Sequence, residues 1–444
     1  MMPGANGAAT RAFTLALASS VAVSLALVAA LAPRAAAQDG EPPLCRAGLV
    51  VAAEASCRYP GVGDRDYPFA VDRSGRALFL FLSDATAITV PGWRIDGRRV
   101  WFAAHAQADG SWLVTSAGVP PEGAGPTSDA VVVLADGWSA ADVAVASVLS
   151  AATEGSVVLY THRERLPEES REVLGDVLPR KVVVLGGPAA VGADVIAAIR
   201  GSTGLSGVER IAGADRYGTA AQAARSVLGE PGGDAVTVVL ANGHSPADIG
   251  TAAAVAARTA NAAVLYTAAG ELPDAAAAVL REYRPARAVI VGGPAAVPAA
   301  VVAAVREAAS GVEVVRVAGG TRFATAAAAA QHLLGDPRSD RDLAVVVANG
   351  HSPADIGAAV ALATRTANSV VLYTAADRIS GPTARTLSLY RPTRIVIVGG
   401  HAAVSDEAEH EIAQAAPDAG IERFSGRTRT HTAAVIARHI LQTP

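Results

Sequence analysis

One block of sequence occurs three times, at intervals of 106 and 107 residues, across the last 317 of the chain's 444 residues. Each copy carries four motifs in the same order: A-[DN]-G-x-S-x-A-D, V-L-Y-T, [LV]-G-G-x-A-A-V and R-x-x-G-x-x-R. The first motif begins at Ala135, Ala241 and Ala348, and the last begins at Arg210, Arg316 and Arg423. A self-similar period of this length marks one structural unit per copy, so three units have to pack together in one chain.

Within the second copy, short β-branched runs alternate with alanine-rich helical segments. Strands are expected at 236–241, 263–267, 288–291 and 314–318, and helices at 246–259, 273–282, 298–309 and from about 321. Continuous apolar strands that alternate with helices are typical of a parallel sheet covered on both faces. The sequence therefore predicts an α/β fold of three tandem Rossmann-like parallel-sheet modules, at 129–229, 234–335 and 342–443.

The region before the repeats has a different composition. Residues 38–118 hold three of the four tryptophans, and Ser74-Gly75, Asp96-Gly97 and Asp109-Gly110 are turn signals between short alternating runs. These features predict a small all-β domain. Strands are expected at 69–72, 77–82, 87–90, 99–104 and 112–115. The Pro- and Gly-rich segment 119–128 is interpreted as a linker.

The first 37 residues have the pattern of a secretory signal peptide. Arg11 precedes an apolar run, and Ala35-Ala36-Ala37 supplies small residues for cleavage. An uncleaved membrane anchor is the alternative; after cleavage no membrane span is expected. Removal of 1–37 takes away Arg11 and Arg34 and no acid, which moves the net charge from −4 to −6. In a secreted chain the isolated pair Cys45 and Cys57 is expected to form a disulfide.

The repeated polar residues fit helix capping better than catalysis. In the first motif a serine precedes an aspartate by three residues at a helix start, the spacing of an N-cap and its N3 partner. The paired glycines of the third motif mark a strand-to-loop corner. The residues assigned these structural roles are Ser139, Asp142, Ser245, Asp248, Ser352, Asp355, Gly186, Gly187, Gly292, Gly293, Gly399 and Gly400.

The fourth motif places an arginine at the first turn of a helix, where the helix dipole disfavours a cation. Two interpretations stay open: each arginine pairs with the aspartate of its own unit, or it helps to bind an external phosphate or carboxylate. The candidate polymer-binding residues are Arg210, Arg216, Arg316, Arg322, Arg423 and Arg429.

Other classes of site lack their signatures. Nucleotide binding would need G-x-G-x-x-G or a P-loop lysine, and the one lysine, Lys181, precedes a strand. The acidic chain gives no reason to expect a nucleic-acid partner. Two cysteines without a nearby histidine cluster do not form a metal site. No catalytic residue, metal or cofactor is assigned.

The motifs resemble the cell wall binding repeat, type 2. The resemblance rests on R-I-A-G-A-D-R-Y-G-T-A at 210–220, A-N-G-H-S-P-A-D at 241–248 and V-I-V-G-G-P-A-A-V at 289–297, and it recurs three times over 128–444. It implies α/β modules packed as an intramolecular pseudo-threefold trimer, and non-covalent tethering to an anionic polymer of a Gram-positive cell wall. The third copy departs from the pattern, because Thr430 stands where Tyr217 and Phe323 carry an aromatic ring.

Three functional hypotheses remain. The first is a secreted, non-catalytic protein of the cell wall or cell surface that binds an anionic wall polymer through its repeats. The second is an adhesin or layer scaffold in which the repeats serve as a rigid platform. The third is a wall hydrolase, or a modifier of one, that acts through the N-terminal domain.

Overall fold

The computed structural model describes seven strands within residues 44–118, and then residues 128–337 and 342–442. The chain divides into two compact units, 1–124 and 125–444. The expected signal segment 1–37 and residues 119–127 of the expected linker lie outside the described residues. Within the described part, no helix combines the length and apolar character that a membrane crossing requires.

The first unit contains a seven-stranded antiparallel sheet in the order β1-β2-β3-β4-β6-β5, with β7 paired to β6. β5 pairs with β6 in antiparallel register, with Ile95 opposite Arg98, and Cys45 lies opposite Cys57 on paired strands. The seven described strands agree with the all-β prediction, the expected strand at 87–90 lies outside the described residues, and the disulfide stays a prediction. The strands are β1 (Leu44–Arg46), β2 (Glu54–Arg58), β3 (Asp66–Val71), β4 (Arg76–Leu78), β5 (Trp93–Ile95), β6 (Arg98–Ala106) and β7 (Trp112–Gly118).

The second unit contains three four-stranded parallel sheets, which confirms the predicted α/β class. Module 1 comprises β8 (Ser128–Asp136), α2 (Ala140–Ala151), β9 (Ser156–Thr161), α3 (Glu168–Val177), β10 (Pro179–Leu185), α4 (Ala193–Thr203) and β11 (Glu209–Ile211). Module 2 comprises β12 (Thr237–Asn242), α6 (Pro246–Ala257), β13 (Ala262–Thr267), α7 (Asp274–Tyr283), β14 (Arg287–Val291), α8 (Ala299–Ala308) and β15 (Glu313–Val317). Module 3 comprises β16 (Ala344–Asn349), α10 (Pro353–Thr364), β17 (Ser369–Thr374), α11 (Gly381–Tyr390), β18 (Arg394–Val398), α12 (Asp406–Ala415) and β19 (Gly420–Phe424).

Each sheet buries both faces, as its uninterrupted apolar strands require. In β8, Val131 and Val133 face the core shared by all three modules, whereas Val132 and Leu134 face the outer helices α3 and α4. Each sheet has its second strand beside the first and its third strand on the first strand's other side, so the order in which parallel strands are added reverses between the first and third strands. At that point the loops after both strands diverge at the carboxyl edge, the usual ligand position in open α/β sheets.

One further helix follows the fourth strand of each module; it contacts the central helix of its own module and also packs on the sheet of the next. We call these three the crossing helices: α5 (Arg216–Leu228), α9 (Arg322–Leu334) and α13 (Arg429–Gln442). Ala221 and Ala224 of α5 lie in the outer core of module 2, and Ala330 of α9 lies in that of module 3. Ala434 and Ala437 of α13 lie in the outer core of module 1, so the end of the chain closes the ring on its first module.

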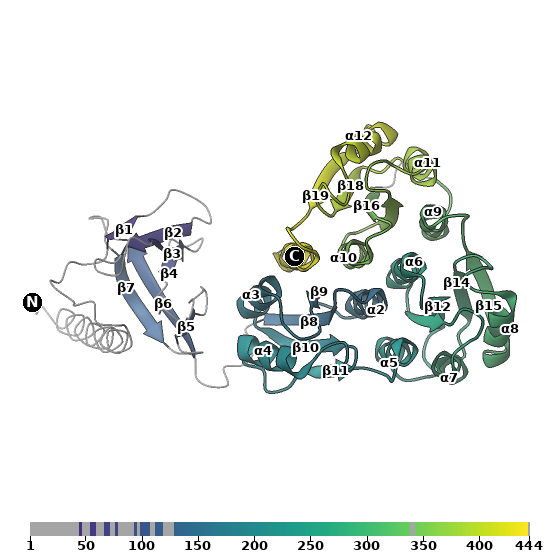
Figure 1. Cartoon of the computed structure of the whole chain (residues 1–444), viewed down its shortest axis with the longest axis horizontal. Helices are drawn as coiled ribbons and strands as arrows, with labels where there is room; N and C mark the ends of the chain where they lie inside the picture. The colour runs from purple at the N-terminus through teal and green to yellow at the C-terminus, as the bar shows by residue number, and fades with distance from the viewer. Residues whose placement is uncertain are drawn as a thin grey trace, which may run out of the picture. The chain divides into compact units, whose positions relative to one another are not determined.

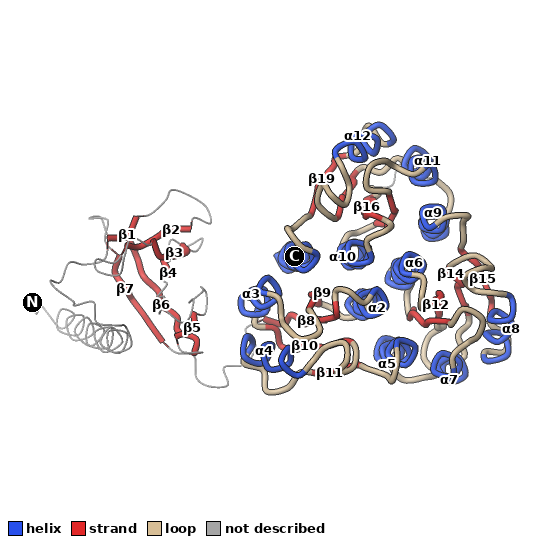
Figure 2. The backbone as a smooth tube through the Cα atoms, viewed as in Figure 1, coloured by secondary structure: helices blue, strands red, loops and turns tan. Residues whose placement is uncertain are grey.

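The helices α2, α6 and α10 pack against one another at the centre of the ring (Figure 1; Figure 2). Their approach depends on glycine. A Cβ atom at Gly250 would lie 2.2 Å from Ile356 Cγ2, and one at Gly357 would lie 1.9 Å from Val143 Cγ1. A β-branched side chain of one helix thus fills the space that glycine leaves on its neighbour. The modules form the predicted pseudo-threefold arrangement around this contact.

Three buried tyrosines from the V-L-Y-T strands connect the modules. Tyr160 donates its hydroxyl to the Ala354 carbonyl oxygen at 2.9 Å, and Tyr266 donates to Ala141 at 2.7 Å. Tyr373 completes the set by donating to the Ala247 carbonyl oxygen at 3.3 Å. Every module therefore satisfies a carbonyl group of the central helix next to it, which makes the ring a set of mutually dependent parts.

Candidate functional site

The loop after the first strand of each module places a serine at the start of the central helix, and in modules 1 and 3 this serine caps the helix. The Ser139 hydroxyl accepts a hydrogen bond from the Asp142 backbone N–H at 3.3 Å, and Ser352 accepts from Asp355 at 3.5 Å. In module 2 the Ser245 hydroxyl donates instead to the Asp248 carboxylate at 2.8 Å. These contacts give the serines and aspartates a local structural role at the carboxyl edge of each sheet.

Burial raises the pKa of all three aspartate carboxyls, which lie beside the paired glycines. Hydrogen bonds from the serines and the charges of nearby arginines oppose that shift: Arg216 lowers the pKa of Asp142, Arg322 that of Asp248 and Arg429 that of Asp355. Each arginine thus acts on the aspartate of its own unit, the pairing that the sequence analysis left open. The influence is electrostatic, because the hydrogen bonds of these arginines go elsewhere.

The paired glycines form the corner at the end of the third strand. Gly186, Gly292 and Gly399 have φ of 95°, 108° and 113°, the left-handed region that favours glycine. The second glycine of each pair, Gly187, Gly293 or Gly400, faces open space. Only the first glycine is thus required by backbone conformation.

Arg210, Arg316 and Arg423 hold this corner. Arg210 donates to the carbonyl oxygens of Gly186 at 2.5 Å and Val191 at 2.9 Å, and Arg316 makes the equivalent bonds to Gly292 and Val297 at 2.6 and 2.9 Å. Arg423 donates to the Gly399 carbonyl oxygen at 2.8 Å and forms an ion pair with Glu409. Both terminal nitrogens of these guanidinium groups therefore have partners within the protein.

The second arginine of each motif lies at a junction between modules. Arg216 at the start of α5 donates Nη1 to the Gly243 carbonyl oxygen of module 2 at 2.6 Å, and Arg322 donates to Gly350 of module 3 at 3.0 Å. Arg429 donates to Gly137 of module 1 at 3.2 Å. All three side chains are exposed, so these junctions bring cationic groups of one unit to the carboxyl edge of the next.

An aromatic ring and a histidine accompany the arginine at two junctions. The Tyr217 hydroxyl lies 3.3 Å from His244 Nδ1, with ring centroids 6.2 Å apart, and Phe323 lies 5.8 Å from His351. At the third junction Trp138 replaces the histidine and stacks on His162 at 3.9 Å, while the Arg429 guanidinium lies 4.8 Å from the indole. The sequence pattern contains aromatic residues at 217 and 323 but does not predict their contact with a histidine.

The threonine one turn into each crossing helix holds the motif's glycine. Thr219, Thr325 and Thr432 accept hydrogen bonds from the backbone N–H groups of Gly213, Gly319 and Gly426 at 3.0–3.1 Å. A Cβ atom at Gly213 would lie 2.2 Å from the backbone of Gly218. The motif R-x-x-G-x-x-R therefore folds its loop tightly onto the helix start and fixes where the second arginine emerges.

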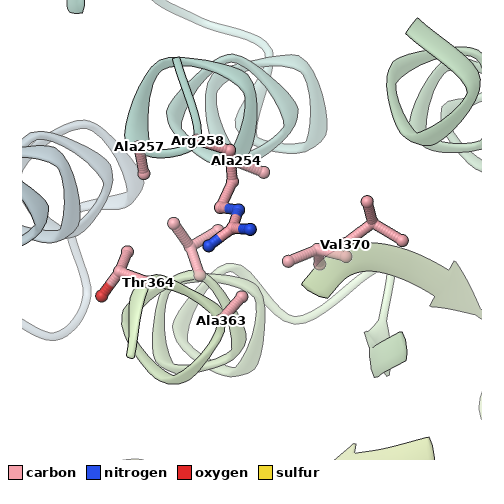
Figure 3. A pocket seen from close by; sticks show the side chains of 8 residues that line it. Ala254, Ala257, Arg258, Ala363, Thr364 and Val370 are labelled. Atoms are coloured by element: carbon pink, nitrogen blue, oxygen red, sulfur yellow. The ribbon is translucent and has the colours of Figure 1, made fainter. Parts of the chain in front are cut away.

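The crevice between the first and third strands is occupied by the protein itself. Asn242 Nδ2 donates across it to the Ala296 carbonyl oxygen at 3.0 Å, and Asn349 does the same to Ala403 at 2.9 Å. Two shallow pockets lie between the central helices, one of them beside Arg258 and Ala363 (Figure 3), and neither leaves room for a water molecule. Within 128–337 and 342–442, no three metal-ligating side chains gather into a site. These observations reveal no enclosed ligand site in the part of the repeats that the structure describes.

Comparison with known proteins identifies the repeats. The family model of cell wall binding domain 2 matches residues 210–302 and 316–409. The two segments are copies of that domain. Each match begins at the first arginine of R-x-x-G-x-x-R and so includes a crossing helix together with the module on which it packs. Residues 128–209 and the end of the chain supply the third set of these elements through the packing of α13 on module 1.

The chain is similar to several wall-associated proteins. It is 27% identical over 280 residues, 63% of its length, to N-acetylmuramoyl-L-alanine amidase LytC of Bacillus subtilis (strain 168), and it spans 52% of that protein. Among solved structures, Cwp8 from Clostridium difficile matches with a TM-score of 0.57 over 78% of this chain and 64% of Cwp8, at 18% identity. Cwp6 from the same organism matches with a TM-score of 0.54 over 70% of this chain and 44% of Cwp6, also at 18% identity. These structures share the fold.

Proposed function

We propose that this chain is a secreted surface protein whose ring of repeats holds it non-covalently on the cell wall by binding an anionic wall polymer. The family of the repeats supports the wall as the target. An anionic ligand is supported by three arginines whose exposed guanidinium groups lie at the three junctions: Arg216, Arg322 and Arg429. Each begins a crossing helix and adds its charge to the positive end of a helix dipole.

The hydrogen bonds of Arg216 and Arg322 to the glycine carbonyls use Nη1 alone. A guanidinium group has five N–H donors, and their planar fork matches the oxygens of a phosphate or carboxylate. The glycine contact thus orients each group without using all its donors. Arg210, Arg316 and Arg423 have both terminal nitrogens engaged, so in this proposal they position the corner on which the junction rests.

Wall binding is tested by sedimentation of the full-length protein with isolated cell walls. The protein should sediment with intact walls and remain in the supernatant after the anionic polymers have been extracted. Binding should weaken as salt rises, because the contacts at exposed arginines are screened. Since the whole chain is acidic, with a net charge of −4, attraction has to come from the junctions. Sedimentation unchanged by polymer extraction would refute an anionic ligand.

The double variant Arg216→Ala/Arg322→Ala separates polymer capture from the platform hypothesis. If the arginines bind the polymer, the folded variant should bind walls at least tenfold more weakly than the wild type. Undiminished binding by a folded variant would favour a rigid platform, for which the buried contacts of α2, α6 and α10 are the supporting observation. Arg306→Ala on α8, away from the junctions, is the matched loss of one positive charge.

The N-terminal unit is proposed to be non-catalytic. The amidase relative gives the opposite hypothesis its support, but about half of that protein's length lies outside the match. Release of soluble peptide or sugar fragments from purified peptidoglycan by the full-length chain would show that the protein is a hydrolase. We expect no release above a heat-inactivated control.

A further inference from the structure

We infer that the three junctions have different roles. The junction between module 3 and module 1, which we call the latch, closes the ring, and the other two junctions carry the arginines that face the ligand. The latch comprises Trp138, His162, Arg365, Arg429 and Arg438. The second half of this inference rests on the proposed function, whereas the first half stands on the packing alone.

The three junctions differ in covalent connection. After α5 the chain needs only residues 229–236 to enter β12 of the module on which α5 packs, and after α9 it needs only 335–343 to enter β16. By contrast, α13 packs on a module that lies far upstream, and the bonded pair Arg429 and Gly137 is separated by 292 positions. The entropy cost of closing a loop grows with its length, so this junction needs additional contacts to stay closed.

The hydrogen bonds from arginines at the ends of the central helices are concentrated at that junction. Arg365 Nη2 donates to the carbonyl oxygens of Ser150, Thr153 and Ser156 in module 1, at 2.8, 2.6 and 3.2 Å. The equivalent Arg258 makes one bond across the next junction, to Thr366 at 3.5 Å, and the remaining copy has Ala152 at this position. The three positions align by the repeat, so the difference lies in the residue and in its surroundings.

The outer contacts follow the same asymmetry. Arg438 of α13 pairs with Glu172 at 3.1 Å and with Asp176 at 3.4 Å on α3, whereas α5 has the single pair Arg225–Glu282 at 2.8 Å. Trp138 adds an indole that contacts both the His162 ring and the Arg429 guanidinium. Such stacking of a cation and a second ring on an indole stabilises the helix start against module 1.

The presence of Trp138 in place of a histidine also changes which chemical groups a ligand can contact at this junction. At the other two junctions an exposed imidazole, His244 or His351, stands beside the arginine and offers nitrogen atoms. At the latch, the Trp138 indole contacts one side of the Arg429 guanidinium in place of an imidazole, and Thr430 is buried where the other copies carry Tyr217 and Phe323. The polymer therefore meets two equivalent arginine–histidine sites and one that serves closure.

Local stability is measured by amide hydrogen exchange of the full-length protein, read out in α5, α9 and α13. Trp138→Ala should speed exchange in α13 at least tenfold and leave α5 and α9 within twofold of the wild type. His244→Ala is the matched control at the first junction and should leave α5 within twofold, because the short connection keeps that helix in place. Arg438→Ala and Arg225→Ala form a second matched pair with the same expected order. Equal effects at the two junctions would overturn the latch.

Wall binding supplies the second readout. At a temperature where all variants are folded, Arg216→Ala and Arg322→Ala should each weaken sedimentation with walls by about tenfold, and Arg429→Ala by less than twofold. Trp138→His should strengthen wall binding while it speeds exchange in α13. Equal losses for the three arginines would refute the different roles of the junctions. If the wild type itself failed to bind walls, the proposed function would fall, and the exchange experiment would still decide the latch.

Discussion

At the scale of single residues, the ring depends on a few positions where one atom decides whether two modules meet. The tyrosines at 160, 266 and 373 place a hydroxyl group on a neighbouring helix, and the glycines at 250 and 357 make room for a neighbour's side chain. All five are buried among residues from two modules. Substitutions here test the ring rather than an individual sheet.

Replacing Tyr266 by Phe should lower the free energy of unfolding by about 1–2 kcal/mol. The change removes the hydrogen bond that the tyrosine hydroxyl donates to the buried Ala141 carbonyl oxygen. Urea unfolding followed by helical circular dichroism measures the effect, since the described helices lie in the repeats. Tyr217→Phe is the matched control, because its ring is only partly buried and should cost less than half as much. Equal losses would contradict a structural role for the tyrosine contact.

Replacing Gly357 by Ala should destabilise the ring by about 1–3 kcal/mol. The new Cβ atom would lie 1.9 Å from Val143 Cγ1, so the central helices would have to separate. Gly187→Ala, with open space around the added carbon, should change the same unfolding curve little. Adding Val143→Ala to Gly357→Ala should recover part of the loss. Failure of that second substitution to help would argue against a steric cause.

The buried aspartates predict a pH dependence with a definite sign. Burial raises the folded-state pKa of Asp355 above 3.8, so the folded protein holds this proton more tightly than the unfolded chain. Stability from this group is therefore largest at low pH and is lost as pH rises through the raised pKa. Asp355→Asn should equal or exceed the wild type in stability at pH 7, and its advantage should shrink towards pH 4. Thermal unfolding across this range measures it; an advantage that grew on acidification would contradict the sign.

At the scale of elements, the crossing helices link consecutive modules. Each uses small residues, such as Ala221 and Ala224 in α5, to lie close to the sheet of the following module. The helix α13 performs this role for module 1 and also carries partly buried Ile440 and Leu441. Each module is therefore incomplete without a helix that another module supplies: modules 2 and 3 receive theirs from the preceding module, and module 1 receives α13 from module 3.

Deleting residues 429–444 should expose the outer core of module 1 while leaving module 3 largely intact. Ala434 and Ala437 would no longer cover Leu134 and Leu159, whose apolar surface would meet water. Hydrogen exchange should then rise in β8 and β9 far more than in β16 and β17. A comparable rise in modules 1 and 3 would mean that the ring melts as one unit. No change in module 1 would contradict its dependence on α13.

At the scale of the whole molecule, three modules in one chain satisfy contacts that separate subunits would otherwise have to provide. Each central helix contacts the other two, and each crossing helix packs on a module of the same chain. The second unit therefore leaves none of its three junctions to be completed by another copy, and its arginines stay exposed at those junctions. A closed ring of this kind is suited to bind a repetitive polymer at several points.

The full-length protein is expected to be a monomer. Light scattering coupled to size exclusion should give a mass independent of concentration. Truncation at 428 should add larger species, because module 1 then presents an uncovered apolar face. A stable trimer of the intact chain would contradict closure within one molecule.

Much of the fold and part of the candidate site could be predicted from the sequence repeat. The elements of the second copy occur where the sequence predicts them: the expected strand at 288–291 is β14 and the expected helix at 298–309 contains α8. The capping serines followed from local spacing, because an N-cap bond joins residues three positions apart. The arginines were assigned together, although Arg210 fastens a corner of its own module and Arg216 reaches the next. Their spacing does not reveal this difference, since it depends on where two modules meet.

The sequence alone determined the α/β units, their number and the family of the repeats, because these properties depend on periodicity and on motifs within about a hundred residues. Only the tertiary structure decided which module each crossing helix joins, which arginines are exposed, and that Trp138 and Arg365 stabilise the one junction without a short connection. Those properties depend on contacts between residues up to 292 positions apart. Local spacing does not specify such contacts, because they exist only once the ring has closed.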